Sequence, residues 1–269
     1  MKRLRIYVAA VAAGALLALA GPGAAAQATA PTGEADRNAP NPSAPGAETT
    51  PAPTTLEPLV AAAQAGNAAA MNDLGVLYSL GASVPRDYSK ALYWYQRAID
   101  HGSAEAMNNL GTMYLYGIAL PRDYANAFRW FQRSSEHGNV HGMYSVAVMA
   151  EIGLGTSRDP GLARAMYRRA AESGCTPAMV KVSDDSARAG ARGDLVEAYA
   201  WLEVALQSGL PEELQIAALS KMEVLGARLG PGRRDQARVR ATQLAALVRI
   251  RALSGNDEVR SPSPAPLRL

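Results

Sequence analysis

Histidine is the residue type in this chain whose spacing comes closest to metal chemistry. His137 and His141 are four residues apart, and on one helix that spacing places two imidazoles beside the same ion. Gly138 lies between them, however, and predicts that a helix ends there. A zinc site needs three or four ligands, and the nearby acidic residues are not clustered. We therefore predict no metal site and no other cofactor.

Catalytic motifs are also missing from the sequence. It has no nucleophile elbow, no serine–lysine motif, no zinc-protease motif and no glycine-rich phosphate loop. Its single cysteine, Cys175, follows a glycine at an expected helix start. We interpret it as a small residue at a helix junction, with an intermolecular disulfide as the alternative. The sequence thus predicts a protein that is not an enzyme.

The residue types that suggest chemistry recur with a period of 36 residues. Trp94 and Trp130 are one period apart, and so are His101 and His137. A fixed period of this size indicates stacked supersecondary units that bury a face against one another. Because the tryptophans recur at equivalent positions, we interpret them as packing residues. The same period relates Gly66, Gly102, Gly138 and Gly174, and also Met71, Met107, Met143 and Met179.

Each unit divides into two helices. Apolar residues at helical spacing predict a first helix over residues 68–80, which ends at Gly81. Asp87 has the chemistry of an N-cap for a second helix. Gly75 interrupts the first helix, although glycine in a helix interior costs about 1 kcal/mol relative to alanine. Its recurrence at Gly111 predicts close contact with the backbone or an aromatic side chain of the partner helix.

The period also organises the rest of the chain. A half-repeat over 56–65 precedes units over 66–101, 102–137, 138–173 and 174–208, and capping helices over 211–253 follow. The capping helices are expected at about 211–229 and 232–253, with a polar exterior. Residues 27–55 and 254–269 hold prolines and few large apolar side chains, and predict a disordered tether and a disordered tail.

Residues 1–26 carry the pattern of a secretory signal. Lys2, Arg3 and Arg5 precede an apolar run and a small-residue cleavage site that ends at Ala26. This pattern predicts a periplasmic or secreted protein, with a retained membrane anchor as the alternative. No other stretch is long and apolar enough to cross a bilayer, so no span remains after cleavage. Without the three N-terminal cations, basic and acidic residues balance at 24 each, which argues against nucleic-acid binding.

Two units share a detailed pattern. It comprises Ala70, Leu74-Gly75, Tyr78, Gly81, Asp87, Ala91, Trp94-Tyr95, Ala98 and Gly102, and then Ala106, Leu110-Gly111, Tyr114, Gly117, Asp123, Ala127, Trp130-Phe131 and Gly138. This pattern resembles the Sel1-like repeat, a relative of the tetratricopeptide repeat, as found in secreted bacterial proteins. The resemblance implies an all-α, right-handed α-solenoid of about four stacked helix-turn-helix units. It also implies protein or glycan contacts, often in the bacterial envelope, and no catalysis.

The resemblance also locates a candidate binding surface. In stacked two-helix repeats the first helices line the concave face, and positions turned away from the core point into it. Asn72 and Asn108 are equivalent, and a row of amides can hold the backbone of an extended peptide. Solvated helix surface is the alternative interpretation. The candidates on this face are Asn72, Val76, Asn108, Thr112, Tyr116, His141, Tyr144 and Glu151.

The last expected helix is the one feature that the repeat does not explain. Nine arginines against three acidic residues follow Gly226. We expect either a solvated basic face or a dock for an anionic partner, with Arg233, Arg234, Arg238 and Arg240 as candidates.

The favoured hypothesis is a monomeric, non-enzymatic scaffold or adaptor of the bacterial cell envelope, which binds a protein partner on the concave face. The first alternative is binding of peptidoglycan or another anionic envelope polymer through the basic helix. A penicillin-interacting or cell-wall hydrolase is the less favoured alternative.

Overall fold

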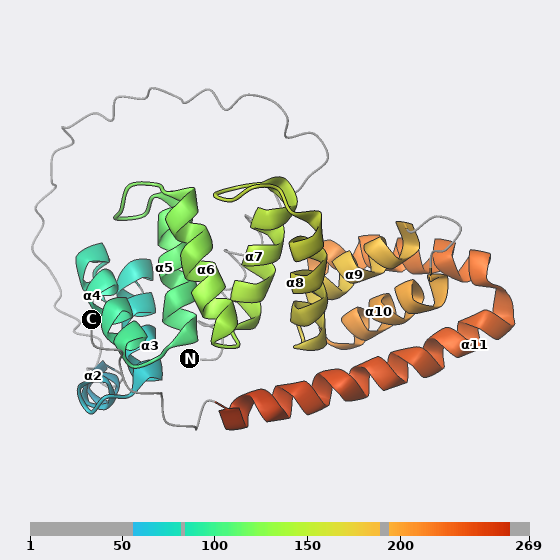
Figure 1. The fold of residues 1–269 in the computed structure, drawn as a ribbon. Helices are drawn as coiled ribbons and strands as arrows, with labels where there is room; N and C mark the ends of the chain where they lie inside the picture. Colours follow the sequence, from blue (N-terminus) through green and yellow to red (C-terminus); the bar gives the residue numbers. More distant parts are fainter. Residues whose placement is uncertain (1–55, 82–83, 189–193, 259–269) are drawn as a thin grey trace, which may run out of the picture.

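The computed structural model describes residues 56–81, 84–188 and 194–258, and every regular element in these ranges is a helix (Figure 1). The predicted signal, the tether and residues 259–269 lie outside the described residues. The predicted all-α solenoid of stacked helix pairs is confirmed. A short α2 (Leu56–Gln64) leads into the pairs, and a long α11 (Glu212–Glu258) follows them. The pairs are α3 (Ala68–Leu80) with α4 (Tyr88–Asp100), α5 (Ala104–Tyr116) with α6 (Tyr124–Glu136), α7 (Val140–Ile152) with α8 (Pro160–Glu172), and α9 (Thr176–Arg188) with α10 (Leu195–Gln207).

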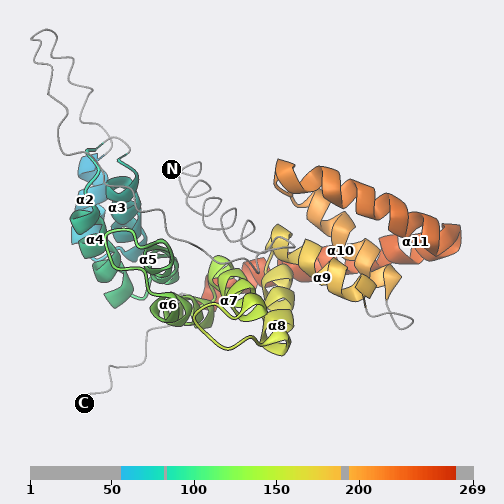
Figure 2. The same ribbon diagram turned by 90° about the horizontal axis from the view of Figure 1, so that it is seen from above.

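Successive pairs stack side by side along a curved row (Figure 2). In that view α3, α5 and α7 lie on the inner side of the curve, and α4, α6 and α8 lie on the outer side. The first helices of the first three pairs therefore form the inner face. Among the described helices, none combines the length and the apolar character that a membrane span requires.

The ends of the helices follow from capping chemistry. Asp87, Asp123 and Asp159 cap the second helices, and each side chain accepts a hydrogen bond from the backbone N–H three residues further on. Asn67 does the same for α3. At the opposite end, Gly81 adopts a left-handed conformation with φ of 70°, which ends α3. At these positions, contacts within a few residues determine where a helix begins or ends.

Glycine in the first helices lets an aromatic ring of the second helix lie against the backbone. A Cβ atom at Gly75 would lie 2.5 Å from two ring carbons of Tyr95. At Gly111 it would lie 2.8 Å from Phe131, the equivalent residue one period later. The predicted contact with an aromatic side chain of the partner helix is confirmed, and it explains why glycine stands inside a helix.

The recurring tryptophans occupy the margin of the core. Tyr95 and Phe131, one residue further along each second helix, are buried, whereas Trp94 and Trp130 are half-buried. The guanidinium of Arg133 lies over the Trp130 ring, 5.0 Å from its centroid. The rings of Tyr95 and Phe131 lie against the glycines at the centre of each helix pair, and the tryptophans pack at the edge of the core.

α11 breaks sharply at Gly230, whose backbone (φ 71°, ψ 171°) is not helical and which Pro231 follows. We call residues 212–229 the first arm and residues 231–258 the second arm. The second arm turns back along α10 toward α8 (Figure 1). It remains helical to Glu258, beyond the expected helix end at residue 253. No proline interrupts the chain between Pro231 and Pro262, so nothing blocks the helical hydrogen bonds at residue 254.

The exterior of the first arm is less polar than predicted. Ala218, Leu225 and Leu229 are buried, whereas Ile216 is 78% exposed and Val224 is also exposed. The expectation of a polar exterior is wrong for this arm because its sequence holds more apolar residues than one buried stripe accommodates.

Candidate partner-binding surfaces

The two asparagines predicted to form an open row of amides are buried. Asn72 and Asn108 are each 5% exposed. Asn109 Nδ2 donates a hydrogen bond to Asn72 Oδ1 over 2.9 Å, which joins α5 to α3. The expectation that these amides face solvent is therefore wrong. The first helices α3 and α5 contact each other here, and the Asn72 side chain, which faces α5, is covered.

Val76 and Tyr144, two further candidates, are buried as well. Val76 belongs to the apolar core around α3. The Tyr144 ring meets Tyr167 edge to face, with centroids 5.7 Å apart, and burial raises the pKa of Tyr144 above its usual value. Both side chains pack inside the solenoid, Val76 in the core around α3 and Tyr144 against α8, so the expectation that they point into an open concave face is wrong.

The other candidates on the inner face are partly or fully accessible. Thr112, Tyr116 and Glu151 are half-buried, and His141 is exposed. Glu151 is bound within the protein, because Tyr167 Oη and Lys181 Nζ both donate to its Oε2. Three candidates therefore remain open to a partner, namely Thr112, Tyr116 and His141.

Two polar atoms on α5 are buried without a hydrogen-bond partner. They are Asn108 Oδ1 and Tyr116 Oη. Thr112 lies between them on the same side of the helix, and its Oγ1 donates to the carbonyl of Asn108. A buried polar atom without a partner costs about 1–3 kcal/mol, so these two atoms lower the stability of the packing around α5. Sequence reasoning identified these residues but not their unmet hydrogen bonds.

The arginines of the second arm divide into anchoring and exposed groups. Arg240 donates from Nε to Glu197 Oε2 over 2.6 Å and from Nη2 to Glu197 Oε1 over 3.3 Å. It therefore fastens the second arm to α10, and the expectation that it faces solvent with the others is wrong. Arg233, Arg234 and Arg238 are exposed, and Arg238 lies 3.5 Å from Asp235.

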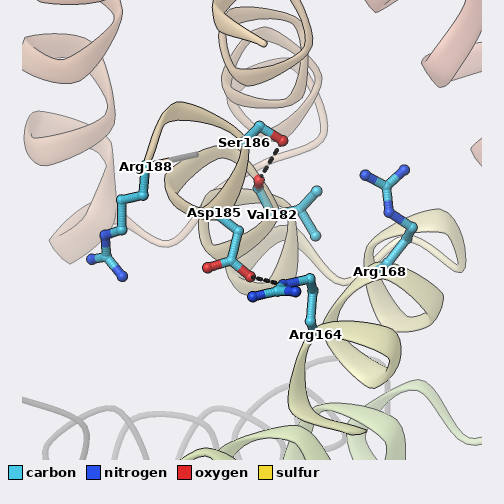
Figure 3. Close-up of a pocket in the computed structure, with 6 residues that line it drawn as sticks. All are labelled: Arg164, Arg168, Val182, Asp185, Ser186 and Arg188. Atoms are coloured by element: carbon cyan, nitrogen blue, oxygen red, sulfur yellow. Dashed lines mark hydrogen bonds and ion pairs between the residues drawn. The ribbon is translucent and has the colours of Figure 1, made fainter. Parts of the chain in front are cut away.

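A cleft between α8 and α9 carries a cluster of arginines that sequence reasoning missed (Figure 3). Its volume is about 450 Å³. The i, i+4 spacing of Arg164 and Arg168 was a signal for a shared helix face, but their approach to α9 follows only from packing. The lining residues are Arg164, Arg168, Val182, Asp185, Ser186 and Arg188.

The possible metal ligands among the described residues form no binding cluster, and the single cysteine is buried. Within the described ranges, no three His, Cys, Asp or Glu side chains gather closely enough to hold a metal ion. Cys175 is buried, and burial raises the pKa of its thiol to about 12. This placement agrees with a small residue packed at a helix junction.

Comparison with known proteins identifies the repeat. The model of the Sel1 repeat matches residues 68–103, 104–139, 140–175 and 178–210, which is more than half of the chain. A comparison with curated proteins gave no match.

Three solved structures show related repeats. The chain is similar to c5321, a protective antigen of uropathogenic Escherichia coli with an SLR fold, at 23% identity and a TM-score of 0.60. The match covers 80% of this chain but only 45% of that protein. A Sel1 repeat protein from Oxalobacter formigenes is 28% identical over 48% of this chain and 97% of its own, with a TM-score of 0.45. The cysteine rich protein B of Helicobacter pylori is 18% identical over 44% of this chain and 90% of its own, with a TM-score of 0.36. The four matched repeats coincide with the four helix pairs, and the chain belongs to the Sel1-repeat family.

Proposed function

We propose that this protein is a non-enzymatic scaffold of the bacterial cell envelope that binds a protein partner on the inner face of its repeats. Sel1-repeat proteins generally mediate protein–protein interaction, which supports the scaffold role. The N-terminal sequence supports the location, because Lys2, Arg3 and Arg5 followed by an apolar run are typical of export signals.

One observation carries the choice of surface. On the inner face, Thr112 and Tyr116 of α5 are half-buried and His141 of α7 is exposed, whereas the other candidates are buried or bound within the protein. These three side chains offer accessible surface to a bound segment. We therefore propose that the partner lies across α5 and contacts Thr112.

Site-specific photocrosslinking in the source bacterium tests this surface. A photoreactive residue replaces Thr112 on the inner face, and matched variants carry it at Tyr93 on α4 and Arg129 on α6, which are exposed. We expect a discrete crosslinked protein from position 112 that is absent from positions 93 and 129. Adducts from the outer positions alone would contradict the proposal, as would equal labelling from all three.

An anionic envelope polymer is the second candidate, because Arg233, Arg234 and Arg238 are exposed on one arm. Its binding is expected to fall steeply between 50 and 300 mM salt, by roughly tenfold or more, because exposed charges are screened. Replacing all three arginines with glutamine should abolish sedimentation of the protein with isolated peptidoglycan. Binding that persists in this triple variant would exclude these three arginines as the contact.

A further inference from the structure

The side chains that line the cleft between α8 and α9 carry more positive than negative charge. Three arginines line it, and Asp185 is the single carboxylate among the lining residues. In Figure 3 Arg164 reaches toward Asp185, the guanidinium of Arg168 points away from that pair, and Arg188 projects on the other side of Asp185. The lining therefore carries a formal excess of positive charge at neutral pH.

Arg164 is only loosely engaged. Its Nε lies 3.6 Å from Asp185 Oδ2, which is longer than a hydrogen bond, and its side chain is 71% exposed. A guanidinium has five N–H donors in a fixed fork. Most donors of Arg164 therefore remain available to another acceptor.

Arg168 is also left with a weak partner. Its Nη1 lies 3.8 Å from Glu197 Oε1, and its side chain is 49% exposed. Glu197 already accepts two hydrogen bonds from Arg240 and one from Trp201 Nε1. Because the charge of Glu197 is satisfied by closer donors, Arg168 is free to engage a different anion in the cleft.

The acidic residues around the cleft are committed to other cations. Asp184 accepts from Lys221 Nζ over 2.7 Å, and Glu151 accepts from Lys181 Nζ over 3.2 Å. Neither carboxylate is therefore available to neutralise the cleft. Asp185 and Glu197, at 3.6 and 3.8 Å, are thus the acidic partners that these contacts leave to Arg164 and Arg168.

We propose that the cleft between α8 and α9 is a binding site for an oxyanion, either a carboxylate or a phosphate, carried on a small apolar stem. Arginine forks match the planar or tetrahedral oxygens of these groups and bind them in a bidentate manner. Val182 supplies an apolar wall for the stem. The site is separate from the proposed partner surface on α5, so failure of one proposal would not refute the other.

Titration of the purified full-length chain tests the proposal. Amide resonances are followed by NMR while sodium phosphate or sodium butyrate is added, with sodium chloride holding the ionic strength constant. We expect saturable shifts at Arg168, Val182 and Ser186 with at least one of the two anions. Saturation by phosphate only, by butyrate only, or by both identifies which oxyanion source the cleft accepts.

Variants show whether the arginines are responsible. The double variant Arg164→Gln/Arg168→Gln should weaken the apparent Kd at least tenfold, and Arg188→Gln tests the third arginine alone. Arg129→Gln, which removes an exposed arginine on α6, is the matched control and should leave the Kd unchanged. Shifts that do not saturate with either anion, or that survive both cleft variants, would overturn the proposal. If the double variant unfolds, Arg188→Gln and the wild-type titration still decide the outcome.

Discussion

Tyr167 Oη on α8 donates a hydrogen bond of 2.6 Å to Glu151 Oε2 on α7, and Lys181 on α9 donates to the same oxygen over 3.2 Å. This carboxylate joins three successive helices at the inner side of the third unit. One period earlier the equivalent residues are Phe131 and Leu115, which are both buried and apolar. The same helix pairing is therefore stabilised by a charged hydrogen bond in one unit and by apolar packing in the unit before it.

Loss of the Tyr167 hydroxyl should destabilise the protein. A hydrogen bond to a charged group contributes about 1.5–3 kcal/mol, so we expect Tyr167→Phe to lower the free energy of unfolding in urea by that amount. The double variant Tyr167→Phe/Glu151→Leu recreates the apolar pair of the second unit and should lose less than the two single variants together. Unchanged stability of Tyr167→Phe would show that the contact contributes nothing.

Acid should weaken the same contact. Burial raises the pKa of Glu151, but the hydrogen bonds from Tyr167 and Lys181 lower it by more, so its pKa lies below the ordinary value of 4.5. The carboxyl therefore stabilises the fold fully above pH 4.5, and this contribution is lost as the pH falls through the lower pKa of the folded state.

Urea midpoints measured between about pH 6 and pH 3 check this dependence. The Glu151→Gln variant should lose stability less steeply in acid than the wild type. Glu105→Gln, which removes an exposed carboxyl, is the control and should follow the wild-type curve. Parallel curves for wild type and Glu151→Gln would refute the role of this group.

A methyl group at Gly75 should be destabilising, although alanine is the better helix former. The added Cβ would lie 2.5 Å from the Tyr95 ring, and overpacking of this kind costs about 1–3 kcal/mol. At Gly226, also helical, the nearest atom would be 3.4 Å away, which is ordinary contact. We expect Gly75→Ala to lower the thermal midpoint and Gly226→Ala to leave it unchanged or raise it, and the opposite order would contradict the packing argument.

Release of Arg240 should loosen the second arm of α11. Glu197 is 12% exposed, so removal of its closest cation leaves a largely buried carboxylate and costs about 1–3 kcal/mol. Hydrogen–deuterium exchange should rise in residues 231–253 of Arg240→Gln. Arg238→Gln is the matched control, because Arg238 is exposed and pairs only with Asp235 on its own helix. Equal exchange in the two variants would show that the second arm is held by other contacts.

Cys175 should react slowly with thiol reagents in the folded protein. Burial raises its pKa to about 12, so at pH 8 little thiolate is present and the sulfur is covered. Labelling with a disulfide reagent should be slow in buffer and rapid, with one equivalent per chain, in concentrated urea. Rapid labelling of the native protein would reopen the alternative of an intermolecular disulfide.

Much of the helical framework is predictable from the sequence because it is determined locally. Asp87 and Gly81 mark helix ends through contacts within a few residues, and those contacts recur every 36 residues. The close contact at Gly75 was predictable because glycine destabilises a helix interior, so a glycine that recurs there indicates that another group packs against the backbone. The repeat family, the helix boundaries within the repeat units and the face that each pair buries internally follow from this periodicity.

Only the tertiary structure decided which polar residues remain available. Asn72 looked open on its own helix, but its amide oxygen is bonded to Asn109 of the neighbouring first helix. Arg240 looked like part of a basic face, but it meets Glu197, which is 43 residues away in the chain. The spacing of apolar residues along one helix specifies which of its faces packs against the other helix of the pair. Which residues are buried between successive pairs depends instead on the curvature of the row and on how closely the pairs stack. That stacking, and the return of the second arm along α10, determine which of the candidate residues are free to bind.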